Sequence, residues 1–136
     1  MSETQKKLFK RDYSHELLSI AKGDGASAKA LAREKGFGRP ENIVFLVQQS
    51  VEKALKAVLN YHQIPFPLVH DLGILVALLP DEKAPPGGFD LAQLNPYASV
   101  RRYEEPTAEL TDNEIEASLV AMDAVLVWAE KQLKET

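Results

Sequence analysis

The segment from Pro40 to His62 constrains the fold more than any other part of the chain, because no other stretch is as long and as periodic. Its apolar residues recur at alternating steps of four and three, the spacing of one helix stripe, and a second apolar stripe runs beside the first. The stripes are Ile43, Val47, Ser50, Ala54, Ala57 and Tyr61, and Val44, Val51, Leu55 and Val58. They predict a helix of about 20 residues, roughly 30 Å long, that is buried on more than one side.

The remaining side of this helix is polar. Its residues are Gln49, Glu52, Lys53, Lys56 and Asn60. The charges in the middle exclude a membrane span. Gln48 and Glu52 are four residues apart, as are Glu52 and Lys56, so each pair can interact along one helix face. This polar strip is either internal polar packing or a surface that contacts a ligand, and the spacing alone leaves both open.

The composition is that of one globular domain of 136 residues with a net charge of −4. A negative net charge gives no general basic field, so binding of nucleic acid without sequence preference is not favoured. The chain has no cysteine, which excludes disulfides and thiolate chemistry. No apolar run follows the basic residues near the N-terminus, so we expect no signal peptide and a cytoplasmic protein. We expect residues 1–12 to be a flexible segment and residues 13–136 to form a single helical domain.

A first helical pattern spans about residues 13–35 and contains the segment from Gly23 to Gly25. Two glycines in a helix interior cost roughly 2 kcal/mol relative to alanines, so one interpretation is a break with Asp24 in solvent. The apolar positions stay in phase across the glycines, which favours one long helix. Asp24 would then face inward and need a partner, and Lys53 or Lys56 is the candidate.

Two further helices are predicted between the central segment and the last helix. Pro65 and Pro67 prevent the central helix from continuing, and Asp71 is placed to cap the next helix. The inward positions of that helix are Leu72, Leu75, Val76 and Leu79. The run from Pro80 to Gly88 predicts a loop, and a short helix is expected from Leu91 to Tyr97.

The last helix begins where Thr111 and Glu114 have the spacing of a capping box. Its inward stripe is Ile115, Leu119, Met122, Leu126, Ala129 and Leu133, which Val120, Ala124, Val127 and Trp128 widen. This apolar width exceeds what a small bundle needs, so we expect a homodimer through this helix. No segment alternates with period two for long enough to predict a strand. The predicted fold is all-α, an antiparallel up-and-down four-helix bundle with an additional short helix.

Four motifs follow one another along the chain: ENIVFLVQQSVEKALKAVL, a proline-containing turn, HDLGILVALL, and YASVRRYEE before the last helix. In this order they resemble the HEPN domain family, and the resemblance covers about residues 13–134. It implies a small helical bundle, usually dimeric, similar to the substrate-binding helical part of kanamycin nucleotidyltransferase. In the family the last motif often continues as Arg-Tyr-Pro-Asp, whereas here Glu104 and Glu105 follow Arg102 and Tyr103.

The resemblance also implies what activities to look for. Many members are ribonucleases, often toxins of toxin–antitoxin pairs, in which a His follows an Arg by four to six residues. That motif is not present here, because only three residues separate Arg11 from His15 and no His follows Arg101 or Arg102. We also expect Arg11 and His15 to lie before the bundle. We therefore assign no catalytic residue and do not favour an enzyme. A HEPN ribonuclease with a degenerate motif and a non-catalytic dimerisation module are the alternatives.

Other members of the family act with a minimal nucleotidyltransferase or bind nucleotides. The resemblance therefore favours a companion of such an enzyme, in a toxin–antitoxin-like setting, that binds a nucleotide or another phosphate ligand. The expected partners are a second copy of the chain, the nucleotidyltransferase and the nucleotide, with no membrane. The candidate ligand-binding residues are Lys53, His70, Arg101, Arg102 and Tyr103, beside the polar strip of Gln49, Glu52 and Lys56.

These candidates are chosen for their chemistry. Arg101 and Arg102 offer two guanidinium groups beside the ring of Tyr103, which suits an anion and a stacked base. Their alternative is pairing with Glu104, Glu105 or Asp24. His70 stands before a helix start, where an anion can bind, and its alternative is a structural role near the cap. The three histidines, His15, His62 and His70, lack metal-ligand spacing, so we expect neither a metal nor a cofactor.

Overall fold

The computed structural model describes residues 2–34, 39–98 and 110–134. Its elements are α1 (Glu3–Arg33), α2 (Pro40–Tyr61), α3 (Leu72–Ala77), the 3₁₀ helices η1 (Asp81–Lys83) and η2 (Gly88–Ala98), and α4 (Asp112–Gln132). These described ranges contain no strand. The predicted all-α bundle is therefore confirmed, and none of the described helices is both long and apolar enough to span a bilayer.

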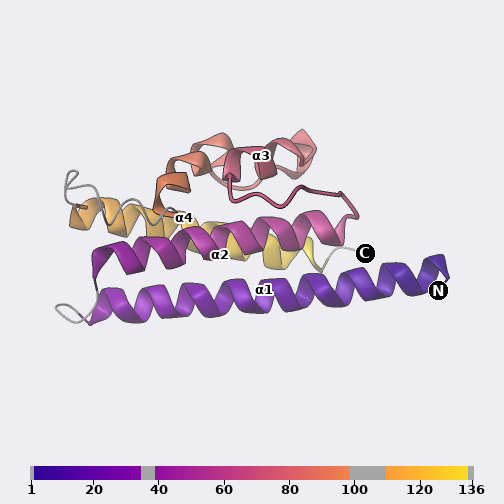
Figure 1. The fold of residues 1–136 in the computed structure, drawn as a ribbon, viewed down its shortest axis with the longest axis horizontal. Helices are drawn as coiled ribbons and strands as arrows, with labels where there is room; N and C mark the ends of the chain where they lie inside the picture. Colours follow the sequence, from indigo (N-terminus) through magenta and orange to yellow (C-terminus); the bar gives the residue numbers. More distant parts are fainter. Residues whose placement is uncertain (1, 35–38, 99–109, 135–136) are drawn as a thin grey trace.

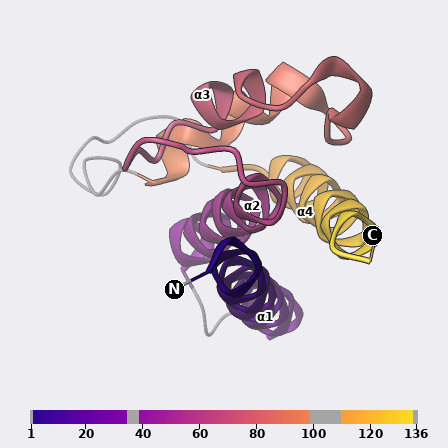
Figure 2. The ribbon, with the colours of Figure 1, turned by 90° about the vertical axis from the view of Figure 1, so that its right-hand side faces the viewer.

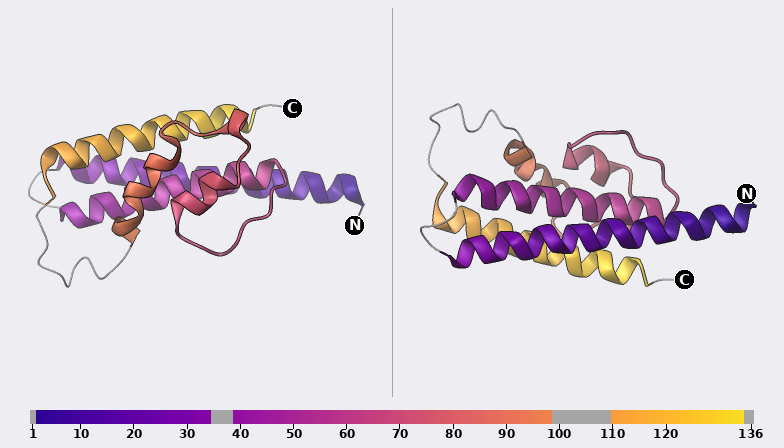
Figure 3. Two further views of the ribbon diagram at one scale, coloured as in Figure 1. Left: turned by 90° about the horizontal axis from the view of Figure 1, so that it is seen from above. Right: turned by 60° about the horizontal axis from the view of Figure 1, so that its bottom comes forward.

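The central helix is α2, around which the other elements are arranged (Figure 1). Seen end-on in Figure 2, α1, α4 and a layer made of α3 and η2 surround α2 on three sides. The helix α1 runs antiparallel to α2, whereas α4 runs in the same direction as α2. The short elements α3 and η2 return the chain across α2, and η2 crosses α2 obliquely (Figure 3). The third leg of the bundle is thus divided between α3 and η2.

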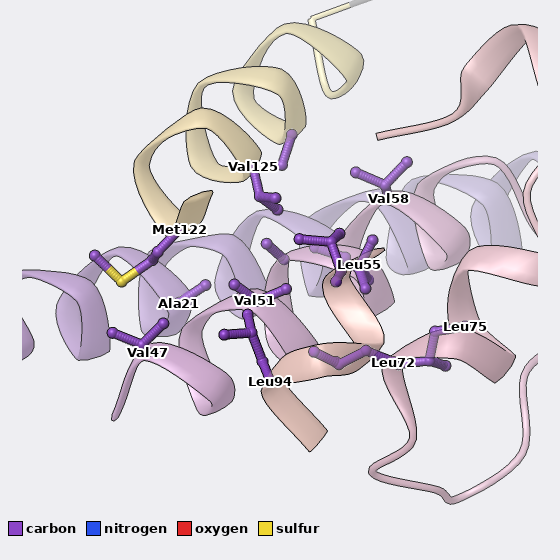
Figure 4. Close-up of a cluster of buried hydrophobic side chains, with 14 of the residues drawn as sticks. Ala21, Val47, Val51, Leu55, Val58, Leu72, Leu75, Leu94, Met122 and Val125 are labelled. Atoms are coloured by element: carbon purple, nitrogen blue, oxygen red, sulfur yellow. The ribbon is translucent and has the colours of Figure 1, made fainter. Parts of the chain in front are cut away.

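The core lies where these layers meet on α2. All ten residues of the two predicted apolar stripes of α2 are buried. Figure 4 shows Val47, Val51, Leu55 and Val58 of α2 among side chains from every other layer. Those side chains are Ala21 of α1, Leu72 and Leu75 of α3, Leu94 of η2, and Met122 and Val125 of α4. A helix that is apolar on two sides is stable only when it is enclosed in this way.

The helix α1 is continuous through Gly23 and Gly25, so the predicted long helix is confirmed. Gly25 is buried where α1 meets α2 and α4. A Cβ atom at this position would lie 3.1 Å from Leu126 Cδ1 and 3.3 Å from both Met122 Cε and Ser50 Oγ. Gly25 therefore allows a close approach of three helices. No such contact surrounds Gly23, where a Cβ atom would meet nothing within 4 Å.

The start of α1 differs from the prediction. The apolar pattern predicts a helix from about residue 13, but α1 begins at Glu3. The first residues carry no apolar stripe, so periodicity could not detect them, although Lys, Gln and Leu are good helix formers. Flexibility of residues 1–12 stays a prediction.

Two predicted caps are present. Asp71 precedes α3, and its Oδ1 accepts hydrogen bonds from the Gly73 and Ile74 N–H groups at 2.8 and 3.3 Å. Thr111 precedes α4, and its Oγ1 accepts from the Glu114 N–H at 3.1 Å. The four residues predicted to face inward from α3 are buried, namely Leu72, Leu75, Val76 and Leu79. Since α3 has only 6 residues, its cap and its burial both matter to its stability.

Candidate functional site on the polar side of α2

The chain turns back over α2 immediately after that helix ends. Gln63 has a φ of 59°, the left-handed conformation usually occupied by glycine after a helix. The Ile64 N–H donates to the Leu59 carbonyl at 2.8 Å, which closes the helix end. This sharp turn occurs before Pro65. The two prolines therefore only extend the segment from Gln63 to His70, which is called the connector below. The connector brings His70 to the polar side of α2.

Glu52 is the centre of the resulting cluster, with only 4% of its surface exposed. Its Oε1 accepts from Gln48 Nε2 at 3.1 Å and lies 2.9 Å from His70 Nδ1. Its Oε2 accepts from Lys56 Nζ at 3.0 Å. The spacing of four residues along α2 places Gln48, Glu52 and Lys56 on one face, and His70 is added by the connector. Both oxygens of a buried carboxylate are thereby satisfied.

Further contacts hold the connector and the cluster together. Gln48 Nε2 also donates to the His70 carbonyl at 3.1 Å, and Gln49 Nε2 donates to Gln48 Oε1 at 2.7 Å. Lys56 Nζ lies 5.9 Å from the ring centroid of Phe66, which belongs to the connector. Gln48 was recognised in the sequence only as a neighbour of Glu52. Its second contact, to the backbone of His70, depends on the path of the connector and has no signal in the spacing.

The electrostatics keep Glu52 ionised. Burial raises the pKa of its carboxyl, but the hydrogen bonds from Lys56, Gln48 and His70 and the charge of Lys56 together outweigh burial, so the net pKa is lowered. An ionised carboxylate only accepts hydrogen bonds. His70 Nδ1 must therefore carry the hydrogen that it shares with Glu52, and Nε2 is the nitrogen left for a ligand. The His70 side chain is 75% exposed.

The remaining members of the polar strip face α1. Lys53 Nζ lies 2.6 Å from Asp24 Oδ2, which confirms the prediction that Asp24 faces inward with a lysine partner and identifies that partner as Lys53. Asn60 Nδ2 donates to Ser14 Oγ at 2.8 Å. The strip is therefore divided. One part packs on α1, and the part around Glu52 lies under the connector with His70 at the surface.

The N-terminus of α3, next to His70, is already occupied. Asp71 Oδ1 accepts from Asn95 Nδ2 at 3.0 Å as well as from the N–H groups of α3, and Asn95 Oδ1 accepts from the Leu72 N–H at 2.8 Å. Asn95 was not recognised in the sequence, because its role depends on η2 packing against α3. Since Asp71 and Asn95 satisfy these N–H groups, an anion near His70 would bind to the side chain rather than to the helix end.

The structure thus brings only some of the predicted site residues together. His70, Glu52 and Lys56 are in direct contact, Gln49 reaches them through Gln48, and Lys53 is next along α2 but paired with Asp24. Three further candidates, Arg101, Arg102 and Tyr103, lie outside the described residues. Within the ranges that the structure describes, no three His, Asp or Glu side chains gather in a way that could hold a metal.

The expectation that Arg11 and His15 lie before the bundle is wrong. Both belong to α1, one turn apart, and both pack against Tyr61 near the end of α2. The Arg11 guanidinium carbon lies 4.9 Å from the Tyr61 ring centroid, and the His15 ring meets Tyr61 edge-on at 6.1 Å. The His62 ring also meets Tyr61 edge-on, at 5.5 Å, and its Nε2 lies 3.0 Å from Gln132 Oε1.

Chemically, the cluster around Glu52 presents one nitrogen with a fixed orientation. His70 Nε2 can donate to an anion when the ring is protonated, and it can accept a proton or attack an electrophile when the ring is neutral. The carboxylate behind Nδ1 supports each of these roles. Lys56 and Lys53 are each paired with a carboxylate, so they balance buried charge at this surface.

Comparisons with known proteins agree with this fold. A family model described as HEPN domain matches residues 14–132. An archaeal HEPN homologue of known crystal structure is similar over 89% of this chain and 98% of its own, with a TM-score of 0.68 and 22% sequence identity. At that identity the likeness concerns the fold. No curated protein matches the sequence.

Proposed function

Since the chain belongs to the HEPN domain family, we propose that it binds a nucleotide or another phosphate ligand and acts as the companion of a minimal nucleotidyltransferase in the cytoplasm. The setting would be that of a toxin–antitoxin-like pair. His70 would contact the phosphate through Nε2, and Lys53, whose ammonium group pairs with Asp24 of α1, is proposed as a second cation for the ligand. Arg101, Arg102 and Tyr103 are proposed as further ligand contacts on their chemistry alone.

The observation that carries this proposal is the exposed, oriented imidazole of His70. A buried charge is costly to maintain, so a buried carboxylate that fixes an exposed ring favours a function for that ring. Here Gln48 and Lys56 hold Glu52, and Glu52 in turn holds His70. An alternative is that the pair serves only to fasten the connector to α2, and this alternative predicts no ligand.

The test is thermal unfolding of the full chain against a panel of nucleoside mono-, di- and triphosphates and a candidate nucleotidyltransferase. A ligand present at a hundred times its dissociation constant stabilises the fold by about 2.7 kcal/mol. We expect His70→Ala and Lys53→Gln to reduce that stabilisation. The matched control is Lys131→Gln, which removes an exposed cation from the end of α4. Failure of every compound and of the partner protein to shift the transition would contradict the proposal.

We also propose a homodimer through α4. Val120 and Val127 are 61% and 53% exposed, and Ala124 lies between them on the same helix face. Beside this face a groove of about 290 Å³ separates η2 from α4, with Leu91, Leu94, Tyr97 and Ala117 among its lining residues. Exposed apolar surface next to a groove is typical of a protein interface.

The oligomeric state can be tested by sedimentation equilibrium. We expect a dimer for the wild type and a monomer for the Val120→Asp, Val127→Asp double variant, because two charges at an apolar interface are costly to desolvate. Ile74→Asp is the matched control, since Ile74 is 43% exposed on α3, away from α4. A monomeric wild type would exclude the dimer.

A ribonuclease is the second candidate, and the position of Arg11 and His15 favours it. Both side chains contact Tyr61 from successive turns of α1, with Arg11 half-buried and His15 exposed, so a cation and an imidazole lie near the same ring. Together they could assist attack of an RNA 2′-hydroxyl. The test is cleavage of short RNA by the full chain. A ribonuclease of this kind would lose activity in both Arg11→Gln and His15→Ala, whereas intact RNA after incubation with the wild type would exclude this candidate.

A further inference from the structure

Glu52 contacts the inner nitrogen of the His70 ring and leaves the outer nitrogen uncovered. Reversible binding of a ligand does not require this orientation. Glu52 Oε1 lies 2.9 Å from Nδ1, on the inner side of the ring, and the rest of the side chain is at the surface. No hydrogen bond to Nε2 is present within the described residues. The neutral ring therefore has its hydrogen on Nδ1 and its lone pair on the exposed nitrogen.

A carboxylate in this position makes Nε2 a better nucleophile. As Nε2 forms a bond to an electrophile, positive charge develops on the ring, and a negative charge hydrogen-bonded to Nδ1 stabilises it. The stabilisation is effective because Glu52 is buried and its geometry is fixed by Gln48 and Lys56, so little reorganisation is needed during the reaction.

The other two histidines differ from His70 in this respect. His15 is exposed and lies edge-on to Tyr61, and in the described part of the chain no carboxylate pairs with it. His62 is half-buried, and its Nε2 is 3.0 Å from the amide oxygen of Gln132. His15 therefore matches His70 in exposure without the carboxylate. A comparison of His15 with His70 separates the effect of side-chain exposure on histidine reactivity from the effect of Glu52.

We propose that His70 is a phosphoryl-acceptor site, with Nε2 as the nucleophile and Glu52 as the positioning residue. Covalent capture of a phosphoryl group goes beyond the reversible binding proposed above, and it does not depend on a nucleotide binding to the chain. The substrate class is a phosphoryl donor whose leaving group departs readily.

The step forms one bond and breaks one bond. The Nε2 lone pair attacks phosphorus, the Nε2–P bond forms, and the bond from phosphorus to the leaving group breaks with its electron pair on the leaving group. With phosphoramidate as the donor, ammonia leaves. Nδ1 keeps its hydrogen, so the phosphorylated ring carries a positive charge that the Glu52 carboxylate offsets. No oxidation or reduction takes place.

The charges around His70 permit an anionic donor to approach. Glu52 is balanced by Lys56 at 3.0 Å, and on the α1 side of the polar strip Asp24 is balanced by Lys53 at 2.6 Å. The carboxylate of Asp71, the next residue, accepts from the N–H groups of α3 and from Asn95. The carboxylates of this surface thus have donors of their own and leave little negative charge to repel a phosphoryl group.

The experiment treats the full chain with phosphoramidate and follows each histidine by mass spectrometry of peptides and by ³¹P NMR, which distinguishes phosphorylation at Nε2 from that at Nδ1. We expect His70 to be modified at Nε2 about tenfold faster than His15, a factor typical of a carboxylate that supports an imidazole. Equal rates at His70 and His15 would overturn the proposal, as would reaction of His70 at Nδ1.

A variant tests the role of Glu52. Glu52→Gln keeps the shape of the side chain and removes its charge, so we expect the rate at His70 to fall about tenfold and the rate at His15 to stay unchanged. An unchanged rate at His70 in a folded Glu52→Gln protein would overturn the positioning role. If that variant does not fold, the comparison of His70 with His15 in the wild type still decides the matter. Nucleotide binding is measured separately, so either proposal can fail without the other.

Discussion

At the scale of single residues, Glu52 shows what is needed to bury a carboxylate in a helical bundle. Burial favours the neutral acid, but hydrogen bonds from Lys56, Gln48 and His70 favour the ionised form and lower its pKa. The folded state therefore binds the Glu52 proton less tightly than the unfolded chain does. The stabilisation is complete above the ordinary pKa of glutamate and is lost as the pH falls through the lowered pKa.

This relation predicts how stability depends on pH. Below about pH 4.5 we expect the free energy of unfolding of the wild type to fall more steeply than that of Glu52→Gln. The difference in slope cannot exceed about 1.4 kcal/mol per pH unit, the limit for one proton. At pH 7 the variant should be less stable by about 2 kcal/mol, since it loses charged hydrogen bonds in a buried place.

The measurement is urea unfolding at a series of pH values. Glu130→Gln is the control, because Glu130 also has a lowered pKa, through its hydrogen bond to Lys22, but lies at the surface, where solvent screens the pair. We expect a smaller change of slope for this variant. If the free energies of unfolding of the wild type and of Glu52→Gln change in parallel with pH, Glu52 has the same pKa in the folded and unfolded states, which would contradict the prediction.

Gln63 offers a second prediction at this scale. Its φ of 59° places a side chain in the left-handed region, which costs about 1 kcal/mol for a residue other than glycine. We expect Gln63→Gly to raise the free energy of unfolding by up to about 1 kcal/mol. Part of this gain is offset because glycine also increases the conformational entropy of the unfolded chain. Gln63→Ala is the control, since alanine keeps the Cβ atom and should gain nothing. A loss of stability in Gln63→Gly would show that the Gln63 side chain contributes contacts of its own.

At the scale of elements, the two glycines of α1 have opposite surroundings and so predict opposite effects. Gly23→Ala places a methyl group in open space and should stabilise the protein by up to about 1 kcal/mol through helix propensity. Gly25→Ala places the same group 3.1 Å from Leu126 and 3.3 Å from Met122 and Ser50. Crowding should there cancel or exceed the gain. Thermal unfolding of both variants gives the comparison, and an equal rise in Tm would contradict close packing at Gly25.

At this scale the sequence predicts those features that depend on periodic spacing or on residues close together in the chain. The apolar stripes of α2, the continuity of α1, and the caps at Asp71 and Thr111 follow from spacing and capping chemistry, and the structure confirms them. The pairing of Asp24 with a lysine was also predictable, because a carboxylate on an inward stripe needs a partner.

What could not be predicted depends on where the chain goes between helices. The contact of His70 with Glu52 needs a turn at Gln63, where no glycine marks the left-handed conformation. The contact of Asn95 with Asp71 needs η2 to lie on α3. Both are tertiary contacts across 18 and 24 residues of chain, and no rule based on neighbours in sequence can find them.

At the scale of the whole molecule, all three layers depend on α2. The layers of α1, of α4, and of α3 with η2 each rest on a different side of that helix (Figure 2). A residue at the centre of α2 therefore contributes to every interface, and its loss should weaken the entire bundle rather than one layer. Leu55 is such a residue, fully buried with neighbours from several elements (Figure 4).

We expect Leu55→Ala to lower the free energy of unfolding by about 3 kcal/mol, the usual cost of a cavity in a core. Leu68→Ala is the same substitution at a side chain that is 97% exposed, and it should change stability by less than about 0.5 kcal/mol.

Trp128, the only tryptophan, lies on α4 and reports on that layer, whereas circular dichroism reports on all helices. Because α4 packs on α2, the fluorescence and dichroism transitions of Leu55→Ala should shift together. A fluorescence transition that stays in place while the dichroism transition moves would show that α4 unfolds independently of the central helix.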